Sequence, residues 1–81
     1  MITASQMRAA RALLGLDQRE LAERTGLSLP TIQRMEASEE VIRGNVDSLM
    51  KLIAGFEEAG VELIAAGANS PGGGRGVRLR K

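Results

Sequence analysis

The sequence predicts one small, all-α domain that ends in a short β-hairpin. The first observation is composition: 43% of the 81 residues are hydrophobic, yet there is a single Phe and no Trp or Tyr. A core built from Leu, Ile, Val, Ala and Met favours helices packed on helices. The second is that apolar residues recur at helical spacing up to residue 59, and the third is that this spacing becomes alternation after Gly60. We expect residues 1–59 to form the principal domain and residues 60–81 a C-terminal extension.

The first predicted helix covers residues 4–14. Thr3 or Ser5 can cap its N-terminus, and Gly15 can adopt the left-handed conformation that ends helices. Its apolar residues fall on one face, which should pack against the rest of the domain: Met7, Ala10, Leu13 and Leu14.

Two shorter helices are predicted over residues 18–24 and 29–36, with the turn TGLS between them. Asp17 and Glu20 form a capping-box pattern at the start of the first helix, and Gly26 ends it. Ser28 caps the second helix, and Pro30 lies in its first turn, where a backbone N–H has no intrahelical acceptor. The boundaries of both helices therefore follow from their caps.

Residues 18–37 have the layout of a helix-turn-helix. In the second helix Ile32 and Met35 face inward, which leaves its N-terminal end and opposite face to solvent. The first helix of such a unit holds the second clear of the domain, so that its N-terminal turn can enter the major groove of DNA. The pattern predicts a DNA-binding protein whose partner is double-stranded DNA.

The segment that follows, residues 37–44, carries Glu39 and Glu40. Their charges would repel phosphates, so we expect this segment to face away from DNA as a spacer or a partner edge. Asn45 caps a fourth helix that ends at Gly60. Its apolar residues recur at helical spacing and are expected to face the core: Val46, Leu49, Leu52, Ile53 and Phe56.

Alternation replaces the helical period after Gly60. Residues 61–64 and 77–80 are predicted to be short strands on either side of a Gly-rich loop, residues 65–76, which we expect to be poorly ordered. The strands can close a hairpin within one chain or a sheet shared by two subunits, and the sequence leaves both open.

Composition excludes several classes of function. The chain has no Cys and no His, which removes thiol nucleophiles, zinc-type sites and the usual general base near neutral pH. We therefore expect no enzyme activity, no metal and no cofactor. No segment approaches the roughly 18 apolar residues that span a bilayer, so we expect no membrane role and a cytoplasmic, nucleoid-associated location. With a net charge of only +1, DNA binding requires arginines gathered on one face.

Six residues fit the pattern Q-x-x-L-A-x-x-x-G-x-x-x-x-x-I-x-x-x-E: Gln18, Leu21, Ala22, Gly26, Ile32 and Glu36. On these residues the chain resembles the XRE family, the phage repressor and Cro-like helix-turn-helix regulators, over about residues 4–59. The resemblance implies a four- or five-helix, lambda-repressor-like DNA-binding domain that acts as a transcriptional regulator. It also implies a homodimer on a near-palindromic operator, and we expect the fourth helix or the C-terminal hairpin to form the dimer contact.

The resemblance assigns roles to individual residues. Gln18 matches a position that touches phosphate, and the matching recognition set is Ser28, Leu29, Pro30, Thr31, Gln33 and Arg34. Gln33 can contact adenine and Arg34 can bind guanine or a phosphate, each good base contact giving about 1–3 kcal/mol of discrimination. Leu29 and Pro30 depart from the family's more polar pattern. They can contact thymine methyl groups, or Leu29 can pack against the preceding helix and contact no base.

Four further residues complete the predicted site. Arg19 and Arg43 lie beside helix N-termini, where backbone N–H groups attract phosphate, so both are candidates for contacts with the DNA backbone. Arg11 and Glu36 match the positions of an ion pair in the family. An arginine among apolar neighbours needs a carboxylate to avoid an uncompensated charge, and we expect this pair to be structural.

Two other classes of function are weighed against a regulator. An antitoxin-like or adaptor module would bind a protein partner through Leu29, Pro30 and the C-terminal strand. A carboxylate-based hydrolase is the third interpretation, although the 10 acidic residues fall mainly on polar helix faces. DNA binding that weakens steeply with salt, and selectively on Arg34→Ala, separates a regulator from an adaptor.

Overall fold

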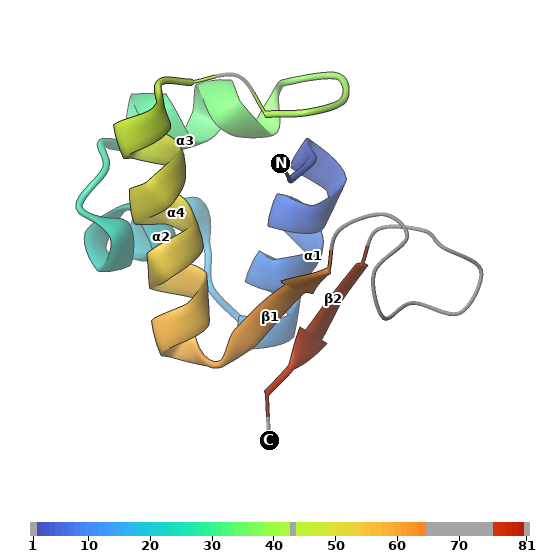
Figure 1. Cartoon of the computed structure of the whole chain (residues 1–81). Helices are drawn as coiled ribbons and strands as arrows, with labels where there is room; N and C mark the ends of the chain where they lie inside the picture. The colour runs from blue at the N-terminus through green and yellow to red at the C-terminus, as the bar shows by residue number, and fades with distance from the viewer. Residues whose placement is uncertain (1, 43, 65–75, 81) are drawn as a thin grey trace.

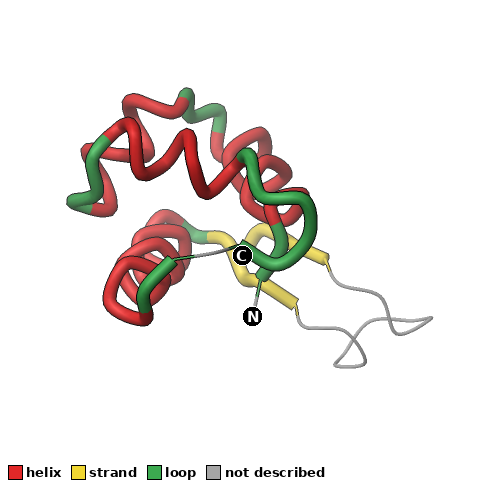
Figure 2. The backbone as a smooth tube through the Cα atoms, turned by 90° about the horizontal axis from the view of Figure 1, so that it is seen from above, coloured by secondary structure: helices red, strands yellow, loops and turns green. Residues whose placement is uncertain are grey.

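The computed structural model describes residues 2–42, 44–64 and 76–80. This part of the chain contains α1 (Ala4–Leu14), α2 (Gln18–Thr25), α3 (Leu29–Glu36), α4 (Val46–Ala59), β1 (Val61–Ile64) and β2 (Gly76–Leu79) (Figure 1). The strands pack against α1, and β1 also contacts α4. Figure 2 shows the two strands side by side at one flank of the helices. The predicted fold class, a helical domain with a C-terminal hairpin, is confirmed.

The predicted helix boundaries are confirmed to within one residue. Each N-cap side chain accepts a hydrogen bond from the backbone N–H three residues further on: Thr3, Asp17, Ser28 and Asn45. Three helices end at glycines with positive φ, a conformation that a Cβ would strain: Gly15, Gly26 and Gly60. These caps satisfy backbone groups that helix ends leave without intrahelical partners.

The core draws apolar side chains from all four helices and β1. Its largest fully buried members are Met7, Leu21, Ile32, Met35, Leu52, Phe56 and Val61. Two predicted core positions are wrong, because Val46 is 70% exposed and Leu13 is 45% exposed. Val46 lies about 60° around its helix from the buried Leu49, and Leu13 lies about 60° from the buried Ala10. Both positions are at a helix edge that no described element covers.

The segment between α3 and α4 does more than connect them. Its Ile42 is buried in the core together with Ile2 from the N-terminal segment, and the Ile42 N–H donates to the Ile2 carbonyl at 3.0 Å. Thr3 and Val41 form an isolated antiparallel bridge beside this contact. The interpretation of this segment as a mere spacer is therefore wrong. A bridge this short shows no alternation in the sequence, so periodicity could not reveal it.

The hairpin closes within one chain. β1 and β2 are antiparallel, with Val61 opposite Leu79 and Glu62 opposite Arg78, and β2 begins one residue earlier than predicted. Gln6 fixes the hairpin to α1, because its buried Nε2 donates to the carbonyls of Ile64 at 2.9 Å and Gly76 at 3.0 Å. Residues 65–75 of the predicted Gly-rich loop lie outside the described residues.

Helices α2 and α4 approach closely at Gly55. A Cβ at this position would lie 2.7 Å from Cγ2 of the buried Thr25, a distance that packed side chains do not tolerate. Gly55 therefore sets the spacing between the helix-turn-helix and the helix that supports it. No helix in the described ranges is both long enough and apolar enough to cross a membrane.

Candidate nucleic-acid interface

The turn between α2 and α3 is held by Thr25, the last residue of α2. Its Oγ1 donates to the Leu21 carbonyl at 2.9 Å and accepts from the Leu27 N–H at 3.3 Å, while Gly26 reverses the chain. Leu21 and Ile32 are both buried, so α2 and α3 share one side of the core. The orientation of α3 is thus set by buried contacts on one face only.

The predicted recognition residues divide into two groups by exposure. Pro30, Gln33 and Arg34 are exposed on α3, and Leu29 and Thr31 are half-buried. The Ser28 hydroxyl donates to Thr31 Oγ1 at 2.8 Å and accepts from the Thr31 N–H at 3.2 Å. These two hydroxyls are therefore engaged with each other in capping α3. Gln33 and Arg34 are the long polar side chains of this face that reach solvent.

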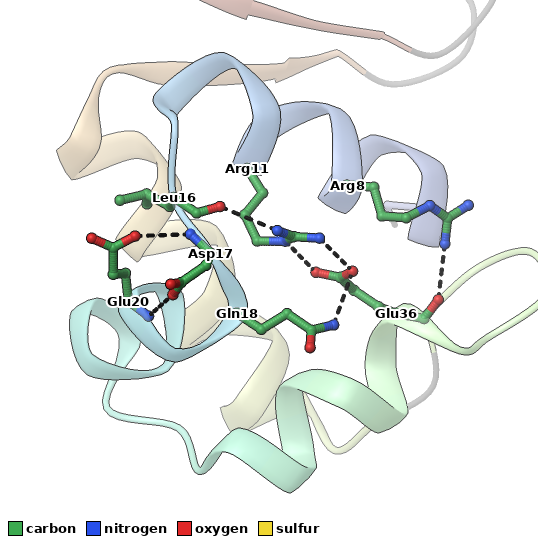
Figure 3. A network of polar contacts seen from close by, with 7 residues as sticks. All are labelled: Arg8, Arg11, Leu16, Asp17, Gln18, Glu20 and Glu36. Carbon is green, nitrogen blue, oxygen red and sulfur yellow. Dashed lines mark hydrogen bonds and ion pairs between the residues drawn. The ribbon is translucent and has the colours of Figure 1, made fainter.

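A buried carboxylate anchors the other end of α3. Glu36 accepts from Arg11 Nε at 2.7 Å and from Arg11 Nη2 at 3.0 Å, a bidentate pair (Figure 3). Gln18 Nε2 donates to the same carboxylate at 3.2 Å. The hydrogen bond to Glu36 is the main reason that the pKa of Arg11 is raised above its usual value. One carboxylate thus joins α1, α2 and α3.

The sequence did not reveal a second arginine at this anchor. Arg8 Nη1 donates to the main-chain carbonyl of Glu36 at 2.9 Å, at the C-terminal end of α3 (Figure 3). A cation at this end is favoured by the helix dipole and by carbonyls that lack intrahelical partners. Arg8 and Arg11 stand three positions apart on α1, a spacing that places both on one helix face and could have indicated the contact.

The start of α2 carries both attractive and repulsive charges for a phosphate. Arg19 is exposed there, but the carboxylates of Asp17 and Glu20 close the capping box at the same helix end. The Gln18 amide already bonds Glu36 through one N–H, so any phosphate contact uses its second N–H. Arg43, the other predicted contact with the DNA backbone, lies outside the described residues.

This geometry is that of a DNA-binding helix-turn-helix domain: a short helix exposed on one face, supported by a second helix and joined to it by a glycine turn. Residues 7–46, about half of the chain, match a family model described as "Helix-turn-helix". The chain belongs to the XRE family of helix-turn-helix regulators. The search of the curated proteins gives no match.

Proposed function

We propose that this DNA-binding regulator recognises a near-palindromic operator as a homodimer, with α3 in the major groove. The observation that carries the proposal is that Gln33 and Arg34 project from the solvent side of α3 while Ile32, Met35 and Glu36 fix its other side. Base contacts from such an exposed helix supply sequence specificity. A role on DNA goes with a cytoplasmic, nucleoid-associated location.

Individual roles follow from the polar atoms that remain available. Gln33 would pair with adenine and Arg34 with guanine or a phosphate, whereas Leu29 and Pro30 would lie against thymine methyl groups. Arg19 and the second amide N–H of Gln18 would contact the DNA backbone, as would Arg43. Ser28 and Thr31 would act mainly by capping α3, since their hydroxyls already bond each other.

Dimer formation addresses the weak charge of the chain. A net charge of +1 allows a single copy to neutralise few phosphates, and the affinity for DNA rises with the number of phosphates that a protein neutralises. Two copies double that number and place two copies of α3 about 34 Å apart on one side of the duplex. We further propose that the chain divides into a DNA-binding unit, residues 1–59, and a C-terminal extension, residues 60–81.

The test is selection of bound duplexes from a random pool, followed by gel shifts of the enriched site over a series of salt concentrations. Arg34→Ala should weaken the enriched site by about 5- to 150-fold, the equivalent of 1–3 kcal/mol, and relax its sequence preference. Arg24→Ala is the matched control, because Arg24 is also exposed but lies in the last turn of α2. No enrichment, or equal effects of the two substitutions, would refute the proposal.

A protein-interaction module is the second candidate. It is favoured by Leu79, an exposed apolar side chain on β2, which is an edge strand of a two-stranded sheet. An adaptor of this kind would show neither a steep salt dependence on DNA nor a selective loss of affinity with Arg34→Ala.

A further inference from the structure

Strand β2 has an open side. The Arg80 N–H donates to the Gly60 carbonyl at 2.7 Å, so residues 60 and 80 form a hydrogen-bonded pair. Along an antiparallel ladder such pairs alternate with pairs whose N–H and C=O groups point away from the partner strand. Val77 and Leu79 belong to the second kind, because each stands an odd number of positions from Arg80. Their four main-chain groups therefore point outward, on the side where β2 has no neighbouring strand among the described residues.

The apolar face of the hairpin is also open at this side. Leu79 lies opposite Val61, on the sheet face that packs on the core, yet it is 48% exposed. On α1, Leu13 stands seven positions after Gln6, which places both on one helix face. Gln6 bonds the Gly76 carbonyl at the start of β2, and α1 and β2 run in the same direction (Figure 1). Seven residues of helix and three of strand each span about 10 Å, so the exposed Leu13 and Leu79 are level with each other where α1 meets β2.

We call the outward main-chain groups of Val77 and Leu79, with the side chains of Leu13 and Leu79, the β2 edge. We propose that the β2 edge binds an extended acidic segment of a partner protein, which joins the hairpin as a third strand. Main-chain groups of the segment would pair with those of Val77 and Leu79. Side chains alternate along a strand, so its apolar side chains would cover Leu13 and Leu79. Its acidic side chains, on the opposite face, would meet Arg78 and Arg80.

The charge on the outer face of the hairpin favours an acidic partner. Arg78 and Arg80 are exposed on this face of β2, whereas its acid, Glu62, lies on β1, one strand further from the β2 edge. Glu62 Oε1 already accepts from Arg78 Nε at 2.8 Å. Helix α1 contains no acidic residue, and the exposed Glu57 and Glu58 lie at the end of α4, the helix that contacts β1. A strand that pairs with β2 would therefore meet an excess of positive charge.

The same features argue against two other occupants. A second copy that paired its β2 with this one would set Arg78 and Arg80 against the same arginines, and like charges on paired strands are destabilising. A DNA phosphate can accept hydrogen bonds, but it offers no donor to the outward carbonyls and no apolar surface to Leu13 and Leu79. Figure 1 also shows the strands on the side of the molecule away from α3. The inference therefore adds a partner to the proposed function and does not depend on it.

The contact is small, because a standard stable interface uses about 20–30 residues on each side. Weak binding of this kind is measured by titration of the full chain, followed through its amide NMR signals. Three hexapeptides serve as probes: alternating Glu and Val, alternating Lys and Val, and three Glu followed by three Val. The first should shift the amide signals of Val77 and Leu79 and bind at least tenfold more tightly than the other two. No binding, equal affinities or shifts confined to other elements would overturn the proposal.

Methylated peptides separate strand pairing from simple attraction between charges. In an extended strand the N–H groups of alternate residues point to opposite sides. Methyl groups on the Val nitrogens of the Glu and Val peptide therefore block one side of the strand, and methyl groups on its Glu nitrogens block the other. One of these two peptides should lose at least tenfold in affinity while the other binds as before. Equal effects of the two modifications would refute addition of a third strand.

Reversal of one charge on the protein tests the choice of an acidic partner. Arg80→Glu should weaken binding of the alternating Glu and Val peptide at least tenfold and strengthen binding of the Lys and Val peptide. Arg24→Glu is the matched control, an exposed arginine on α2 that should leave both affinities unchanged. Equal effects of the two substitutions would contradict the proposal. A DNA duplex of unrelated sequence that shifted the Val77 and Leu79 signals more than the acidic peptide would assign this surface to nucleic acid instead.

Discussion

The bond between Arg11 and Glu36 permits the sharpest test of how the domain is held together. Glu36 has a side chain that is only 6% exposed and accepts three side-chain hydrogen bonds, while the side chain of Arg11 is 23% exposed. Removing one member of a buried ion pair leaves an uncompensated charge, whereas replacing both with apolar residues leaves none. The unfolding free energies lost in the two single substitutions, added together, should therefore exceed the loss in the double substitution.

The magnitudes follow from exposure. Arg11→Met leaves a buried carboxylate with Gln18 as its remaining partner and should cost about 3 kcal/mol of unfolding free energy. Glu36→Leu leaves a guanidinium that reaches water and keeps its 3.1 Å bond to the Leu16 carbonyl, so about 2 kcal/mol is expected. The double variant should lose about 2 kcal/mol. The resulting coupling, about 3 kcal/mol, is large against the roughly 4–12 kcal/mol expected for a domain of this size.

Urea denaturation of the four proteins, followed by circular dichroism, measures this coupling. In a domain of this length 1 kcal/mol corresponds to about 4–8 °C in melting temperature. The Arg11→Met variant should therefore melt at a lower temperature than the double variant, by about that amount. Asp47→Ala paired with Lys51→Ala is the control cycle, because that pair is exposed and should couple by less than about 0.5 kcal/mol. Simple additivity of Arg11→Met and Glu36→Leu would refute the structural role of the pair.

Three further predictions concern other contacts. Gly55→Ala should lower the unfolding free energy by about 1–3 kcal/mol, because its Cβ would clash with Thr25 Cγ2. Adding Thr25→Ser should recover most of that loss, since it removes the methyl group. Denaturation melts in which Thr25→Ser gives no recovery would contradict this. The hydrogen bond from Arg78 lowers the pKa of Glu62 in the folded protein below the value of about 4.3 expected for the unfolded chain. The stabilisation that this bond gives to the fold is therefore complete above that unfolded pKa and is lost as the pH falls through the lower folded pKa. The stability advantage over Glu62→Gln should shrink across that interval, and a difference independent of pH would exclude the linkage. Gln6→Ala should speed amide hydrogen exchange in β1 while exchange in α3 stays unchanged, because it removes both bonds to the hairpin; equal acceleration in the two elements would show a general loss of stability instead.

Local chemistry determined the parts of the fold that the sequence could predict. Caps such as Asp17 and Ser28, with glycines such as Gly26, act within a few residues of their own position, so they fix where helices begin and end. Helical spacing likewise identified Ile32 and Met35 as core residues. These features need no knowledge of what lies elsewhere in the chain.

Contacts between distant segments account for what the sequence missed. Gln6 has the capping-box spacing after Thr3, and its Oε1 accepts from the Thr3 N–H at 2.9 Å, but no pattern in the sequence indicates that its Nε2 is buried against carbonyls 58 and 70 positions away. Val46 has the spacing of a core residue and is exposed because no described element covers its side of α4. Periodicity shows which residues share a helix face, whereas the burial of that face depends on the neighbours that tertiary structure supplies.

The two ends of α3 in the candidate site are held in different ways, and this difference has a consequence for binding. At the C-terminal end of α3, Arg8, Arg11 and Gln18 converge on Glu36 from two other helices. At the N-terminal end, α3 is held by its own cap, and Pro30 is open to solvent. A helix fixed at one end loses little further freedom when its other end is inserted into a groove, so less binding free energy is lost to ordering. We infer that the bonds of Arg8 and Arg11 to Glu36 support DNA binding from outside the interface, by holding α3 at a fixed angle to α1. Substitutions at Arg8 should accordingly weaken binding to all DNA sequences alike, whereas Arg34→Ala should weaken the selected site most.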